Sequence, residues 1–112
     1  MENKSFGKEQ RIRKRSDYQS VYREGTRVHL KSFIVLMNPN CRGKTRLGIT
    51  ASKKVGNSVA RNRIKRLVRE FFRLNRERLP VSTDIVVIAK KDISLLNYQA
   101  VCKELEMMCE RR

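Results

Sequence analysis

Apolar residues recur with two different periods along this chain, and the two periods predict helices and strands. A spacing of three and four residues, which places apolar side chains on one face of a helix, occurs in three segments. They are 16–24, 60–76 and the stretch after Asn97, which is predicted to cap the last helix. Ser16 and Gln19 form a capping-box pattern at the first of these segments, and Gly25 follows its end. The sequence therefore predicts three helices.

Four other segments have the pattern of strands. Two alternate apolar and polar residues, and two are the continuous apolar runs of strands that are covered on both faces. The alternating segments are 26–30 and 46–51, and the continuous runs are 33–37 and 84–89. The order αβββαβα predicts an α+β fold, and a helical crossover between the last two strands implies that they are parallel. At 112 residues we expect one domain over 1–112, with a flexible N-terminus over 1–10.

The central helix has a strongly basic side. Ten basic residues and two acidic ones lie between Ser52 and Leu79, in a chain whose net charge is +16. The side opposite the apolar stripe carries Asn62, Lys65, Arg66, Arg69, Arg73 and Arg76, with Arg61 and Arg63 at its borders. Like charges three and four residues apart repel each other, so the row weakens the helix unless a polyanion lies along it. The pattern predicts nucleic-acid binding rather than a merely solvated face.

Further basic residues flank this helix and the first one. Lys53 and Lys54 precede a helix N-terminus that Asn57 or Ser58 can cap, and free amides there already favour an anion. Basic residues also stand directly before the first helix. We expect Arg11, Arg13 and Lys54 to add phosphate contacts.

Tyr18 and Tyr22 lie one turn apart on the first helix. Packing in the core is the ordinary role of such a stripe. Aromatic rings can also stack on unpaired bases, because every base has a π-face.

The sequence contains little catalytic equipment. His29 is the only histidine, and its place on a strand favours a structural role. The carboxylates are scattered, so no metal site is predicted. Cys41, Cys102 and Cys109 form no CxxC pair and indicate reduced thiols in the cytoplasm. Because no apolar run approaches about 20 residues, no membrane association is expected. The chain is interpreted as a binder.

The stretch SKKVGNSVARNRIKRLVREFF resembles the signature of the bacterial ribonuclease P protein subunit, with Arg61-Asn62-Arg63 at its arginine–asparagine–arginine motif. SDYQSVYREG and DIVVIAKK extend the resemblance. It implies a two-layer sandwich like the second domain of ribosomal protein S5, with a left-handed β-α-β crossover where right-handed ones are the rule. It also implies a protein cofactor of a ribozyme, whose catalytic RNA subunit with bound Mg²⁺ removes the 5′ leader of precursor tRNA. No obligatory protein partner is implied.

The resemblance also implies roles for individual residues. Contacts with the catalytic RNA fall to Arg61, Asn62, Arg63, Lys65, Arg66, Arg69 and Arg73. The cleft for the leader is expected to comprise Tyr18, Tyr22, Ile34, Leu36, Lys53, Ile88 and Lys90. The two tyrosines replace the phenylalanines that the family often has, which keeps the ring and adds a hydroxyl.

Three alternatives stay open at the level of sequence. A general ribosomal-RNA-binding protein would share the charge but leaves the paired rings without a purpose. A DNA-binding regulator would use 60–76 as a recognition helix, although such helices follow another helix rather than a strand. An autonomous protein nuclease would need catalytic groups that are not evident.

Overall fold

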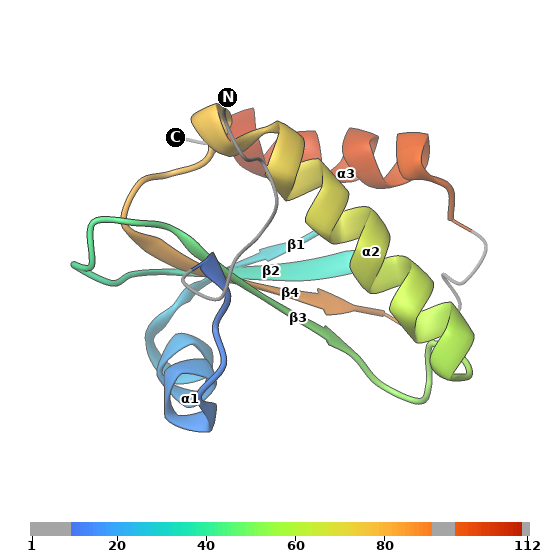
Figure 1. The fold of residues 1–112 in the computed structure, drawn as a ribbon, viewed down its shortest axis with the longest axis horizontal. Coiled ribbons are helices and arrows are strands. Elements are labelled where there is room, and N and C mark those ends of the chain that lie inside the picture. The colour runs from blue at the N-terminus through green and yellow to red at the C-terminus, as the bar shows by residue number, and fades with distance from the viewer. Residues whose placement is uncertain (1–9, 91–95, 111–112) are drawn as a thin grey trace.

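The computed structural model describes residues 10–90 and 96–110, and the predicted order of elements is confirmed (Figure 1). The helices are α1 (Arg15–Glu24), α2 (Ser58–Leu74) and α3 (Tyr98–Glu110), and a 3₁₀ turn (Arg76–Arg78) follows α2. The strands are β1 (Thr26–His29), β2 (Phe33–Pro39), β3 (Arg46–Ala51) and β4 (Thr83–Ala89). Within the described residues, no helix combines the length and apolar character needed to cross a bilayer. The prediction of a flexible tail falls almost wholly on residues outside the described part.

The four strands form one mixed sheet in the order β1-β2-β4-β3. β2 is antiparallel to both β1 and β4, whereas β3 and β4 are parallel, as the sequence predicted. α2 connects β3 to β4, and this is the crossover to which the resemblance assigns a left-handed path. The connection leaves β3 at one edge of the sheet.

Helices cover both faces of the sheet, which explains the continuous apolar runs of β2 and β4 (Figure 1). α2 and α3 pack on one face, where Phe33, Ile64, Phe71 and Phe72 are fully buried. α1 covers part of the opposite face. A smaller core there comprises Ile12, Val21, Leu36 and Val86.

Two of the three predicted helix caps are confirmed, and one is wrong. The Asn57 side chain accepts a hydrogen bond from the Ala60 amide (2.9 Å), and Asn97 accepts one from the Ala100 amide (2.8 Å). The Ser16 capping box does not form, because α1 begins at Arg15 with Lys14 as N-cap and no side-chain cap. A distant contact fixes this start, since the Ile12 amide donates to the Leu47 carbonyl (3.0 Å) and the Ile12 side chain is buried.

An ion pair holds the first residues of β3 and β4 together. Arg46 donates two hydrogen bonds to Asp84, of 2.8 and 2.7 Å, and lies 3.4 Å from Asp17. Asn40 donates a further bond to Asp84 (2.7 Å). Burial alone would raise the pKa of Asp84, but the hydrogen bonds from Arg46 and Asn40 outweigh it and hold that pKa below its usual value. The ion pair between Arg46 and Asp84 therefore stabilises the start of the parallel pairing between β3 and β4.

We expect Asp84→Asn to lower the free energy of unfolding by about 3 kcal/mol at neutral pH, because Arg46 then stays buried without its main partner. The native pKa of Asp84 is depressed, so its contribution is present above the unfolded-state pKa and is lost as the pH falls through the native one. Urea unfolding at neutral and acid pH measures both effects. Glu70→Gln, which removes the partner of half-exposed Arg73, is the control and should change stability far less. Equal losses for both variants would contradict the assignment.

Candidate nucleic-acid interface

The basic side of α2 is divided between exposed and half-buried residues. Asn62 and Arg66 are exposed at its crest. Arg61, Lys65 and Arg69 follow one another at intervals of one turn and are half-buried on the side toward β3. The buried apolar stripe holds this row of three in place, because α2 packs on the sheet through the opposite side.

Two of the predicted RNA-binding arginines differ from this row. Arg73 forms a two-bonded pair with Glu70, with Nε 3.1 Å from Oε1, and the hydrogen bonds from Arg73 lower the pKa of Glu70. Much of the charge of Arg73 is thus neutralised within the helix. Arg63 is half-buried on the Glu70 side of α2 rather than beside β3. The net positive charge of α2 is concentrated on the β3 side and the crest.

A small cavity of about 180 Å³ lies where α2, α1 and β3 meet. Arg11, Lys65 and Arg69 line it, and no acidic residue of the described part does. Desolvation is the main cause that lowers the pKa of Arg69, and electrostatic repulsion from Arg11 lowers it further. A phosphate in this cavity would relieve that repulsion.

The two tyrosines of α1 have different environments. Tyr18 is half-buried, and its ring lies so close over Gly48 that a Cβ there would come within 2.7 Å. Burial raises the pKa of Tyr18. Tyr22 is 37% exposed, and its hydroxyl lies 3.4 Å from Thr50 Oγ1. The ring centroids are 6.3 Å apart. Tyr22 therefore presents its ring to solvent, while Tyr18 supports it.

An open groove adjoins Tyr22 on the sheet face that α1 leaves uncovered. Ile34 and Ile88 are direct partners across β2 and β4, and Thr50 is the partner of Ile88 on β3. The groove has a volume of about 660 Å³. Its lining residues are Ile34, Ser52, Lys54, Ile88, Ala89 and Lys90. Lys90 Nζ donates to the Leu30 carbonyl (2.6 Å), which fixes that ammonium at the groove.

The predicted cleft is thus assembled only in part. Ile34, Ile88 and Lys90 come together, and Lys54 joins them although sequence reasoning grouped it with the outer phosphate contacts. Leu36 is wrong as a lining residue, because it is fully buried beneath α1. Lys53 is exposed near the groove's end but does not line it.

The sequence predicted phosphate contacts for Arg11 and Arg13 but not the second basic hollow, of about 490 Å³, that they line at the start of α1. It is lined by Arg11, Arg13, Lys14, Asp17, Arg42, Lys44 and Arg46. Arg42 and Lys44 belong to the β2–β3 loop, where the NPNCRGK stretch indicates turns and gives no sign of a partner. Only the antiparallel strands and the buried Arg46 bring this loop to α1.

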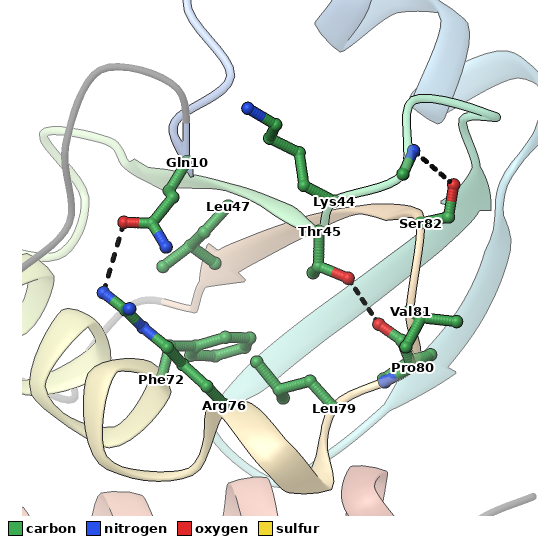
Figure 2. Close-up of a pocket in the computed structure, with 11 residues that line it drawn as sticks. Gln10, Lys44, Thr45, Leu47, Phe72, Arg76, Leu79, Pro80, Val81 and Ser82 are labelled. Atoms are coloured by element: carbon green, nitrogen blue, oxygen red, sulfur yellow. Dashed lines mark hydrogen bonds between the residues drawn. The ribbon is translucent and has the colours of Figure 1, made fainter. Parts of the chain in front are cut away.

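A third hollow is largely apolar and lies on the far side of the same loop (Figure 2). Leu47, Phe72 and Leu79 form its floor, in a volume of about 210 Å³. Arg76 donates to Gln10 (3.2 Å) at one rim, and the Gly43 amide donates to Ser82 (3.1 Å) at the other. Figure 2 shows the Lys44 side chain extending away from this floor. The bond from Gly43 to Ser82 holds the β2–β3 loop in the position that forms the basic hollow.

Among the described residues, no three of His, Cys, Asp and Glu converge in a group that could hold a metal ion. Cys41 is exposed and Cys102 half-buried, both as free thiols, and the Cys109 side chain lies outside the described part. His29 is exposed on edge strand β1. These groups supply no acid–base pair next to the basic surfaces.

Comparison with known proteins agrees with this geometry. The model of the family Ribonuclease P matches residues 6–112. The ribonuclease P protein component of Syntrophus aciditrophicus (strain SB) is 47% identical over 108 residues, which are 96% of this chain and 91% of that protein. The corresponding protein of Desulfovibrio desulfuricans is 46% identical, over 90% of this chain and 81% of its own.

Solved structures give the same result. The RNase P protein from Thermotoga maritima, in complex with 1-(4-fluorophenyl)-2-thiourea, superposes with a TM-score of 0.84 at 35% identity, over 91% of this chain and 99% of that one. The Staphylococcus aureus RNase P protein gives a TM-score of 0.81 at 36% identity, over 88% and 90% of the two chains. With a family match across nearly all its length and the same fold, this chain belongs to the ribonuclease P protein family.

Proposed function

We propose that this protein binds the catalytic RNA of ribonuclease P and the 5′ leader of precursor tRNA, and so promotes removal of the leader. Membership of the family makes the chain a component of an endoribonuclease. The observation that carries the proposal is the placement of two different surfaces on either side of β3. One is the cation row of α2, and the other is the groove beside Tyr22.

The two surfaces suit two forms of RNA. The row Arg61, Lys65 and Arg69 presents charge at intervals of one turn. Lys65 and Arg69 line a cavity without an acidic residue among its described lining, which suits the phosphate backbone of folded RNA. The groove combines the apolar Ile34 and Ile88 with a ring and two ammonium groups, which suits a single strand whose bases are unstacked. We therefore propose that α2 binds the catalytic RNA and that the groove binds the leader.

Bond cleavage is proposed to lie with the RNA subunit. When bound, Mg²⁺ would supply the activated water and the stabilisation of the leaving group. The described part of this chain offers no cluster of ligands for such an ion, so no step of the cleavage is assigned to its residues. Its part is to bind and orient the substrate strand. We place this activity in the cytoplasm, where precursor tRNA is made.

Reconstitution tests the proposal directly. Adding this protein to bacterial ribonuclease P RNA at low Mg²⁺ should increase cleavage of precursor tRNA, because protein cations replace part of the metal that screens the two RNAs. The rate and the site of cleavage are measured by gel electrophoresis of end-labelled substrate. Protein without RNA is the control. Cleavage by the protein alone, or absence of stimulation, would contradict the proposal.

We expect Tyr22→Ala to weaken binding of precursor tRNA to the holoenzyme by about 1–3 kcal/mol, because it removes the ring on which one leader base stacks. Binding of mature tRNA, which has no leader, should be unchanged. Tyr22→Phe is the matched control. It keeps the ring, loses only the contact with Thr50, and should bind nearly as the wild type does. Equal losses for the two ligands would remove Tyr22 from the leader site.

Salt dependence tests the contact with α2. Arg66→Gln should flatten the plot of log affinity for the catalytic RNA against log salt by up to about one unit, since one phosphate contact is lost. Arg66 is exposed, so the fold should be unaffected. Lys103→Gln is the control: it removes one positive charge from an exposed side chain on α3, away from the proposed interface, and should leave the slope unchanged. An unchanged slope for Arg66→Gln would exclude this residue from the interface.

A further inference from the structure

The basic hollow at the start of α1 has an unusual charge distribution. Six basic side chains and one acidic one line a volume of about 490 Å³. Arg46 is neutralised at its floor, because it is bonded to Asp84 and lies beside Asp17. The positive charge of the rim comes from Arg11, Arg13, Lys14, Arg42 and Lys44.

The helix beneath this rim adds to the positive potential. Helix N-termini carry partial positive charge, and acidic residues there are stabilising whereas basic ones are not. The run Arg13-Lys14-Arg15 instead leads into α1, which begins at Arg15 without a side-chain cap. Asp17 is its only acid in the first turn, and it faces Arg46 and Arg42. Local stability does not explain five cations at this end of a dipole.

We propose that this hollow binds the phosphodiester backbone of RNA, as a third contact region beside the cation row of α2 and the groove. The inference rests on the proposed function and extends it to residues that had no role, namely Lys14, Arg42 and Lys44. A phosphate at the hollow would receive charge-assisted hydrogen bonds from the rim and would lie at the positive end of α1.

The hollow and the groove lie on the same face of the sheet. Arg46 and Thr50 are four residues apart on β3 and point to the same side, so the two regions are separated by ~13 Å along the strand. α1 lies between them, with Tyr18 over Gly48 at the midpoint of that interval. The backbone that occupies the hollow therefore comes either from the catalytic RNA or from the part of the leader that has passed Tyr22.

Two variants of the full-length protein test the site. Arg42→Gln and Arg13→Gln each remove one rim charge from an exposed side chain, and Lys103→Gln on α3 is the charge-matched control. Dissociation constants are measured over a range of KCl concentrations in two arms. The first uses catalytic RNA alone, and the second uses the assembled holoenzyme with precursor or mature tRNA.

Each rim variant is expected to flatten the salt slope by about 0.7–0.9 and to weaken binding several-fold, with Lys103→Gln at the wild-type values. Arg42→Lys should restore the slope, because it keeps the charge, whereas a purely structural role of the arginine would leave the lysine variant impaired. Weaker binding of the rim variants to the catalytic RNA alone would assign the hollow to that RNA. Weaker binding of precursor tRNA to the holoenzyme, with binding of mature tRNA unchanged, would assign the hollow to the leader.

Wild-type slopes for both rim variants in both arms would overturn the inference. That result differs from failure of the proposed function, in which the wild-type protein itself would not bind the RNA or would not distinguish precursor from mature tRNA.

Discussion

Electrostatic repulsion within α2 is the constraint around which the surface of this protein is arranged. Its buried stripe of Ile64, Val68, Phe71 and Phe72 packs on the sheet and turns Arg61, Lys65 and Arg69 toward β3. Packing fixes these cations at intervals of one turn, while burial and the nearby charge of Arg11 lower the pKa of Arg69. The apolar contacts of the core thus hold a charge distribution that would be unfavourable in an isolated helix. Such an arrangement is completed by a polyanion.

Local sequence predicts those features of the fold that depend on neighbouring residues. The caps at Asn57 and Asn97 were foreseen because the side chain and the amide it binds are three residues apart. The start of α1 was not, because the contact between Ile12 and Leu47 joins segments 35 positions apart. The parallel pair β3–β4 was foreseen because a helix of this length between two strands permits little else.

In the candidate site, too, features within one element could be predicted, whereas those that depend on distant segments could not. The cation row could be predicted from helical period alone, since its members share one helix. The groove could not be predicted in full, because its lining depends on which face of the sheet α1 covers. Leu36 has the same orientation on β2 as Ile34 but lies under α1, whereas Ile34 does not. The basic hollow depends on the β2–β3 loop reaching α1, which no local pattern encodes.

The environment of β3 has one more consequence. An edge strand with free backbone groups is a template on which another chain can add a strand, and proteins usually block such edges. Here the Ile12 amide donates to the Leu47 carbonyl and the Tyr18 ring lies against Gly48, so the chain's own N-terminal segment and first helix occupy the outer part of β3. The residues that precede the sheet in the sequence therefore hinder pairing of β3 with a strand of another molecule.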